Sequence, residues 1–281
     1  MTIHRSTVIR LAAATFALGS SLLAGCGVPP EVEIGFRSST LLDENALSPN
    51  ALSPNALSPN ALSPNALSPN ALNPSALSPT SLSQLQLNTQ DGINARQLLK
   101  YTVGCSYRPD QSYSYSWTDA QGTVHNETLW GILGLAPEWN TVPLSATKQG
   151  WVSACLASRC NYYGVTVMLS TRGDTNGLDW VDNTEKNTWG NIEGAFWGNA
   201  FASPTRLYAC YKTMNVAHSR AMNRVCSSGL PSGQTTTECA GIKVLGDCDD
   251  LCTGVSATTG FYGSCTGPDG TTSQVMTVFL Q

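Results

Sequence analysis

Apolar and polar side chains alternate strictly over residues 112–117, with two tyrosines and a tryptophan on one face and three serines on the other. A period of two is typical of a β-strand that packs one face against the protein. The segment 119–122, Asp-Ala-Gln-Gly, has the composition of a turn, and residues 123–130 follow it as a return strand. The pattern therefore predicts a β-hairpin in this part of the chain.

Helical spacing replaces the alternation in two other segments. Residues 93–103 carry apolar side chains at intervals of three and four, and Thr89 or Asp91 precedes them as a candidate N-cap. Residues 144–160 gather Trp151 and its apolar neighbours on one face in the same way. We expect a helix over each of these two segments.

Further strands and one loop region complete the predicted fold. The segments 164–172, 206–212 and 273–280 are short and rich in β-branched and aromatic residues, which is typical of strands. The stretch 226–268 is rich in glycine and cysteine and predicts loops held by disulfides. The mixture predicts one α+β domain over residues 88–281, rich in strands and loops, with about two helices.

The N-terminus has the pattern of a bacterial lipoprotein leader. Arg5 and Arg10 precede an apolar run that begins at Leu11 and ends at Leu-Ala-Gly-Cys26. The run is too short to span a membrane, and small residues precede a cysteine that can receive a lipid. We therefore expect residues 1–25 to be a signal peptide and Cys26 to be lipidated, at the start of a spacer over 26–44.

A proline-containing repeat follows the spacer over residues 45–87. The unit Asn-Ala-Leu-Ser-Pro occurs five times without change from Asn45 to Pro69 and then decays. A proline at every fifth position excludes a regular helix and favours an extended stalk. The regular leucines leave a short pentapeptide-repeat β-helix as the alternative, although solenoids need more coils than seven units supply.

Composition limits the partners of the mature chain. Loss of the leader removes two arginines and no acids, which changes the net charge from −4 to −6. A mildly acidic chain with 12% charged residues lacks the basic surface that nucleic acids need. We expect the membrane, through the N-terminal lipid, and a glycan or other envelope component as partners. Gly27 lacks the aspartate that retains some lipoproteins at the inner membrane, so the outer membrane is favoured.

Nine cysteines follow Cys26, and all of them lie beyond residue 100. In an exported chain this usage predicts a disulfide framework, with four bridges and one cysteine left over. The absence of a Cys-x-x-Cys pair argues against zinc. Two cysteines five positions apart on a helix lie on different faces, so we expect Cys155 and Cys160 to pair with other partners. The nine candidates are Cys105, Cys155, Cys160, Cys210, Cys226, Cys239, Cys248, Cys252 and Cys265.

Several segments of the domain resemble an uncharacterised group of myxobacterial-type surface lipoproteins with an Asn-Ala-Leu repeat linker. The likeness covers most of residues 93–265, and the leader and the repeat share it. It implies surface localisation and domain limits, and it carries no activity with it. The segments are Gly134-Leu-Ala-Pro-Glu-Trp139, Trp151-Val-Ser-Ala-Cys-Leu156, Asn161-Tyr-Tyr-Gly-Val165, Glu193-Gly-Ala-Phe-Trp-Gly-Asn199 and Leu207-Tyr-Ala-Cys210.

Two acidic segments are candidate calcium sites, because closely spaced carboxylate and amide oxygens suit that ion. Neither has the spacing of an EF-hand loop, and a solvated acidic turn is the alternative interpretation. No other cofactor is expected. The first segment contains Asp174, Asn176, Asp179 and Asp182, and the second contains Asp247, Asp249 and Asp250.

Seven tryptophans are many for one domain, and exposed aromatic rings stack on sugars. Trp189 and Trp197 flank the segment 190–195, whose glycines and weak periodicity are typical of a functional loop. We therefore predict that one of these two side chains binds a ligand, while a core position is the alternative for every tryptophan.

Catalytic signals are few, since none of the common hydrolase, metalloprotease or nucleotide-binding motifs occurs. Glu138 and Glu193 form a glycosidase pair only if the fold brings them together. A free thiol beside His218 is a second, weaker candidate for a catalytic site. We therefore predict a lipid-anchored envelope protein that is non-enzymatic and acts in ligand binding or envelope structure, with an exported hydrolase of glycans or other envelope polymers as the alternative.

Overall fold

The computed structural model describes residues 42–44, 72, 83, 85–160, 167–176, 178–179, 183–202, 204–228, 238–239, 241–255 and 260–281. All of these residues lie in one unit, Arg37–Gln281. The predicted Asp182 and the predicted signal peptide, with Cys26, lie outside the described residues. So does most of the repeat.

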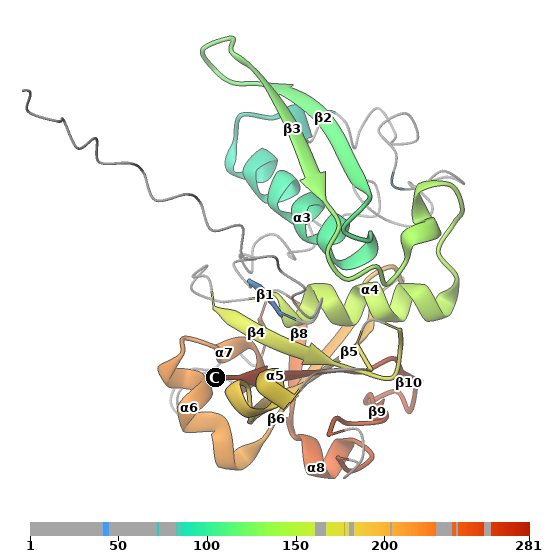
Figure 1. Cartoon of the computed structure of the whole chain (residues 1–281), viewed down its shortest axis with the longest axis vertical. Helices are drawn as coiled ribbons and strands as arrows, with labels where there is room; N and C mark the ends of the chain where they lie inside the picture. Colours follow the sequence, from blue (N-terminus) through green and yellow to red (C-terminus); the bar gives the residue numbers. More distant parts are fainter. Residues whose placement is uncertain are drawn as a thin grey trace, which may run out of the picture. The chain divides into compact units, whose positions relative to one another are not determined.

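The described helices and strands are interspersed along the chain (Figure 1). The helical segments are α3 (Gln90–Ser106), η2 (Pro137–Asn140), α4 (Ala146–Ser158), α5 (Asn183–Thr188), η3 (Thr213–Asn215), α6 (Val216–Ala221), α7 (Val225–Ser228) and α8 (Cys248–Leu251). The strands are β1 (Leu42–Glu44), β2 (Ser112–Thr118), β3 (Val124–Trp130), β4 (Met168–Arg172), β5 (Asn191–Asn199), β6 (Arg206–Tyr211), β7 (Glu238–Cys239), β8 (Ile242–Asp247), β9 (Cys265–Thr266), β10 (Thr272–Ser273) and β11 (Met276–Leu280).

A seven-stranded mixed sheet with the order β1-β4-β11-β5-β6-β8-β7 forms the centre of the domain. Its strands pair antiparallel except for β6 and β8, which run parallel. A ribbon of β2 and β3 and a short pair of β9 and β10 make two smaller sheets. The predicted α+β class, with disulfides, is confirmed.

Strand β5 lies in the middle of the large sheet and is buried on both faces. Phe196 contributes to one apolar cluster, and Ala195 and Trp197 contribute to another. A strand with two buried faces reads as a continuous apolar run and does not alternate. The expectation of a functional loop over 190–195 was therefore wrong, because most of that segment belongs to the central strand.

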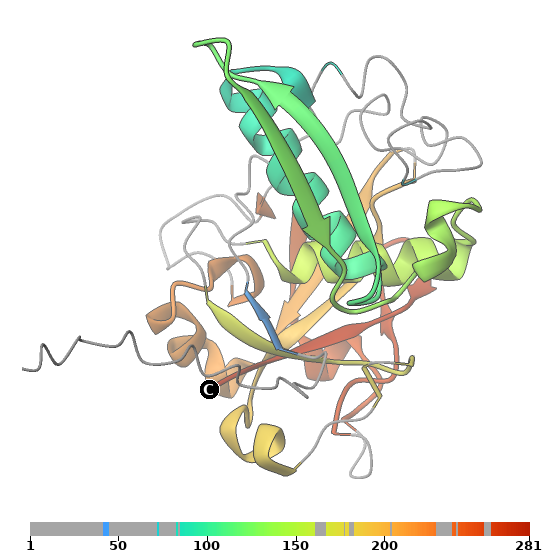
Figure 2. The same cartoon turned by 45° about the horizontal axis from the view of Figure 1, so that its top comes forward.

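Helix α4 lies between the large sheet and a layer formed by α3 and the β2–β3 ribbon (Figure 1 and Figure 2). Thr89 caps α3, as one of the two predicted N-caps, through a hydrogen bond from the Gly92 amide to its Oγ1. The hairpin agrees with the sequence pattern, since β2 turns its aromatic side chains inward and its serines outward. Both predicted long helices and the hairpin are confirmed.

The stretch 226–268 contains more regular structure than expected. Strand β8 joins the large sheet beside β6, and α8 follows it directly. The stretch is rich in glycine and cysteine, and β8 is a six-residue strand that is only partly buried. Its sequence therefore lacks the apolar alternation by which a strand is recognised. The prediction of loops alone was wrong here.

The globular core reaches further toward the N-terminus than residue 88. Leu72, in the sixth unit of the repeat, is buried, and its amide donates to the Trp139 carbonyl over 3.1 Å. The Tyr107 hydroxyl donates to the carbonyl of Leu72. Strand β1 from the spacer also pairs with β4. Leu72 and β1 therefore pack against the domain although both precede residue 88.

No helix among the described residues is long and apolar enough to cross a membrane.

Disulfides connect the layers. Cys105–Cys155 joins α3 to α4, Cys210–Cys248 joins β6 to α8, and Cys252–Cys265 joins the end of α8 to β9. Cys226 is disulfide-bonded as well, and the Cys239 side chain lies outside the described part. Cys160 is free and buried. The prediction that it does not pair with Cys155 is confirmed, whereas the expectation that it pairs with another cysteine was wrong.

Candidate functional site

The β2–β3 ribbon has one face that no other described element covers. Every second side chain of both strands points away from α3 and is exposed. We call these eight positions the outer ribbon face, and none of them carries a charge. They are Ser112, Ser114, Ser116 and Thr118 of β2 with Val124, Asn126, Thr128 and Trp130 of β3.

Trp130 ends this face and is 61% exposed, whereas the other five described tryptophans are buried or half-buried. It stands opposite Ser112 in the register of the ribbon. Ser114 and Thr128 follow as the next outward pair, and their hydroxyl oxygens lie 3.1 Å apart. The face thus combines one open aromatic ring with a row of hydroxyl and amide groups.

The inner side of the ribbon is held by stacked side chains. The Arg96 guanidinium of α3 lies 3.8 Å from the centroid of the Trp117 ring. The His125 ring stacks on the same indole at 4.3 Å and 15°. His125 Nε2 hydrogen-bonds Asp119 Oδ2 over 2.9 Å, and with the amide of Thr123 this bond holds the pKa of Asp119 below its usual value. These contacts fasten the ribbon and its turn to α3.

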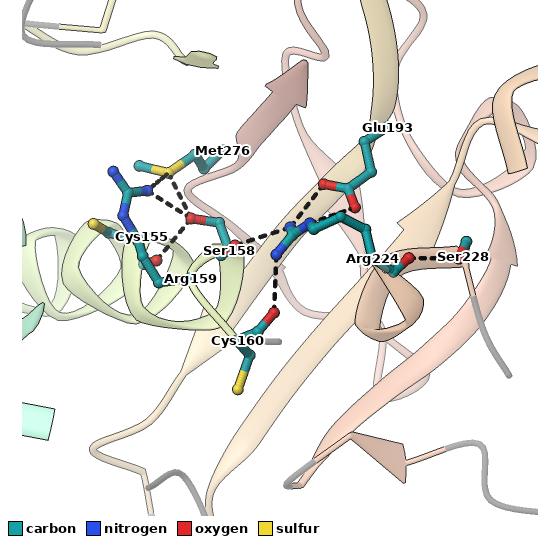
Figure 3. Close-up of polar contacts among 8 residues, drawn as sticks. All are labelled: Cys155, Ser158, Arg159, Cys160, Glu193, Arg224, Ser228 and Met276. Atoms are coloured by element: carbon teal, nitrogen blue, oxygen red, sulfur yellow. Dashed lines mark hydrogen bonds and ion pairs between the residues drawn. The ribbon is translucent and has the colours of Figure 1, made fainter. Parts of the chain in front are cut away.

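A buried ion pair forms the second notable polar group of the domain (Figure 3). Arg224 precedes α7, and its Nε and Nη2 each donate to one oxygen of Glu193 on β5 over 2.7 Å. The guanidinium also donates to the carbonyls of Ser158 and Cys160 over 3.0 Å. Both charged side chains are almost fully buried. The pair therefore joins the end of α4 to the central strand.

This geometry does not fit the predicted glycosidase pair. Both carboxylate oxygens of Glu193 are occupied by Arg224, and the side chain has no access to solvent. Glu138 lies on η2, is 45% exposed, and approaches Lys148 Nζ at 3.9 Å. A general acid must reach the bond that it protonates, so Glu193 cannot serve as one without losing its ion pair.

The predicted thiol–histidine pair is not formed either. Cys160 is fully buried, and burial raises the pKa of its thiol, so that the reactive thiolate is disfavoured. His218 lies on α6 and hydrogen-bonds the carbonyl of the C-terminal Gln281 over 2.8 Å. Figure 3 shows the surroundings of Cys160, where Arg159 donates to Ser158 Oγ over 2.7 Å and to Met276 Sδ over 3.5 Å.

Neither predicted tryptophan is an exposed anchor. Trp197 is fully buried in the core and packs 5.8 Å from the Tyr208 ring, so its prediction as a ligand-binding side chain was wrong. Trp189 follows α5 and is half-buried, and its carbonyl accepts a hydrogen bond from Arg172. The alternation of the hairpin could have identified Trp130 as exposed, because Trp130 lies an even number of positions from the other outward residues of β3.

The described residues of the two acidic segments do not converge on a cation site. Asp174 and Asp179 are exposed, as is Asn176, and no three carboxylates gather among the described residues. Asp247 caps α8 by accepting from the Asp249 amide, and Asp249 pairs with Lys212. The one described group of three metal-ligating side chains consists instead of the sulfurs of Cys210, Cys252 and Cys265.

Comparison with known proteins adds no identification. No protein-family model, no curated protein and no solved structure matches the chain. The described side chains therefore carry the functional conclusion.

Proposed function

We propose that the chain is a lipid-anchored envelope protein that binds a neutral glycan on the outer ribbon face and catalyses no reaction on it. The observation that carries the proposal is Trp130, whose ring stands 61% exposed at the end of an uncharged row of hydroxyl and amide side chains. Soluble domains usually place so large an apolar ring in the core or in an interface.

The chemistry of the face selects a class of ligand. An indole ring offers a flat apolar surface for the C–H face of a sugar, and the hydroxyl and amide groups beside it both donate and accept hydrogen bonds. No basic side chain is present on the face to attract phosphate or sulfate, and no acidic one is present to attract a cation. A neutral polyhydroxylated ligand fits these groups best.

The support under the face favours binding. Trp117, His125 and Arg96 hold the ribbon against α3, so the outward side chains stand on a backbone that is already ordered. A preorganised surface loses less conformational entropy when a ligand docks. The ribbon is thus a firm platform, in contrast to a loop that must be ordered on binding.

Three features of the chain support the cell envelope as its location. The leader ends at a lipidation motif, the cysteines pair as is usual in an oxidising compartment, and the sequence resembles a group of surface lipoproteins. The alternative function, an exported hydrolase, gains no support from the described carboxylates, because Glu193 is committed to Arg224.

The test is a glycan array with the full chain, followed by calorimetry of the best neutral ligand. Trp130→Ala should weaken binding by about 30-fold or more, which corresponds to about 2 kcal/mol for an aromatic hot spot. Trp130→Phe should retain most of the affinity because it keeps a ring. Met214→Ala is the matched control, since Met214 is an even more exposed apolar side chain, at 79%, and lies outside the ribbon.

All three variants should melt at the temperature of the native chain, because the substituted side chains are exposed. Unchanged binding in Trp130→Ala would place the site elsewhere. A full chain that binds no neutral glycan on the array would refute the proposed ligand class.

A further inference from the structure

Two disulfides lie in contact with each other beside the large sheet. Cys210–Cys248 and Cys252–Cys265 approach to 3.6 Å between the sulfurs of Cys210 and Cys252. The sulfurs of Cys210, Cys252 and Cys265 all lie within 4.8 Å of one another, and Cys248 is bonded to Cys210. We call these four residues the four-sulfur cluster.

Regular structure holds each member of the cluster. Cys210 lies on β6, and Cys248 and Cys252 stand one helical turn apart at the two ends of α8, where the Cys252 amide donates to the Cys248 carbonyl. Cys265 lies on β9 and pairs with Cys252 in an antiparallel bridge. The four side chains therefore stay close together through their backbones as well as through the disulfide bonds.

The spacing of the sulfurs suits a tetrahedral metal ion. Four thiolates at about 2.3 Å from Zn²⁺ stand about 3.8 Å from one another. The 3.6 Å contact between the two disulfides is already close to that separation. The sulfurs joined within each disulfide must move apart, and reduction of the two bonds frees the side chains to rotate.

We propose that the reduced chain binds one Zn²⁺ through the thiolates of the four-sulfur cluster. A dithiol reductant opens each disulfide: the S–S bond accepts two electrons and two protons, and the reductant becomes a disulfide. Zn²⁺ then displaces the four thiol protons and forms four Zn–S bonds. The oxidised chain binds no ion there, because sulfurs in disulfides are not thiolates.

The surroundings favour the closed type of zinc site. Cys210, Cys248 and Cys265 are buried, and they pack in an apolar cluster with Trp197 and Tyr262. Cys252 is partly exposed and offers the route by which reductant and ion arrive. A site with four protein ligands and an apolar shell leaves no open position, so its role is structural and not catalytic.

The test uses the full chain in detergent. The chain is reduced under anaerobic conditions, the reductant is removed, and the protein is titrated with Co²⁺ as a spectroscopic probe. One Co²⁺ per chain should bind with the visible bands of a tetrahedral thiolate complex, and Zn²⁺ should displace it. Bound metal should protect the four cluster cysteines from alkylation, while Cys105 and Cys155 are modified.

Two double variants separate the cluster from a general effect of thiols. Cys252→Ser with Cys265→Ser should abolish the cobalt–thiolate absorption. Cys105→Ser with Cys155→Ser removes another disulfide and should preserve the absorption. If the reduced chain unfolds, metal should restore its circular dichroism.

The proposal is wrong if excess metal leaves the reduced chain unfolded or produces no tetrahedral spectrum. It is also wrong if the Cys252/Cys265 variant binds like the native chain, or if alkylation does not distinguish the cluster from Cys105 and Cys155.

Discussion

Arg224 and Glu193 form a buried ion pair between the start of α7, the end of α4 and the central strand. Their bidentate contact at 2.7 Å is buried, and Arg224 also satisfies two carbonyls at the end of α4. Arg224→Met would leave a carboxylate buried without its cation, and such a loss typically costs about 3–5 kcal/mol of unfolding free energy. Urea unfolding of the oxidised chain measures this loss.

An exposed ion pair is the matched control for that prediction. Arg206 and Asp269 also meet at 2.7 Å, but their side chains are 44% and 31% exposed. Arg206→Met should cost less than about 1 kcal/mol. Glu193→Leu combined with Arg224→Met should regain part of the single-variant loss, because no buried charge remains. A loss in Arg224→Met as small as that in Arg206→Met would contradict this assignment.

Asp119 gives a prediction about pH at the same scale. The hydrogen bond from His125, then the Thr123 amide, lowers the pKa of the carboxyl from the usual 3.8. A carboxyl with a lowered folded pKa stabilises the fold above its unfolded pKa, and this contribution disappears as the pH falls through the folded value. The turn should therefore loosen only below about pH 3.8.

Carbon-detected NMR of Asp119 measures its titration, and the fluorescence of the stacked Trp117 reports the turn. Asp119→Asn should remove the acid transition of the turn and leave that of the remaining domain. An Asp119 midpoint at or above 3.8 would contradict the role of His125.

The elements of the fold differ in how far their sequence predicts them. The hairpin buries one face, and the two long helices begin at capping residues and have apolar side chains at helical spacing. These elements were therefore predicted to within a few residues, although Gly150–Ser158 of α4 are buried without interruption. Strand β5 buries both faces and contains two glycines, so it has no alternation to detect. Its assignment requires the neighbours β11 and β6, which come from later in the sequence.

The glycines of β5 are required by the close approach of β6. A Cβ on Gly194 would stand 2.0 Å from the Cys210 carbonyl oxygen. Gly190 lies just before β5, and a Cβ there would meet only the Lys186 carbonyl oxygen, at 3.7 Å. Gly194→Ala should force the two strands apart and cost about 1–3 kcal/mol. Gly190→Ala should remain within about 0.5 kcal/mol of the native chain.

Urea unfolding of the two alanine variants provides the comparison. Both glycines lie in the segment 190–195, which was predicted to be a loop from its composition. Equal stability of the two variants would contradict the placement of Gly194 in the central strand.

At the scale of the whole molecule, long-range contacts decide which residues could form a site. Glu193 and Arg224 meet across 31 positions of sequence, and no local pattern connects them. The parity of the hairpin identifies Trp130 as outward, but only the tertiary structure shows that no other described element covers it while Trp197 is enclosed. The direction of a side chain within one strand was thus predictable from the sequence. Its exposure was not, because exposure depends on which other elements cover that strand.

The proposed attachment of the whole chain to a membrane would depend on one atom, the sulfur of Cys26. The leader predicts cleavage before this residue and transfer of a lipid to it. Cys26→Ser should move the chain from the membrane fraction to the soluble fraction, because the variant lacks the thiol to which the lipid would be attached. Gly27→Ala, beside the cleavage point, should leave the partitioning unchanged. We expect the same melting temperature in both variants. Mass spectrometry of the N-terminal peptide decides between the outcomes: a lipid-modified Cys26 supports the anchor, and an intact leader or an unmodified cysteine rules it out.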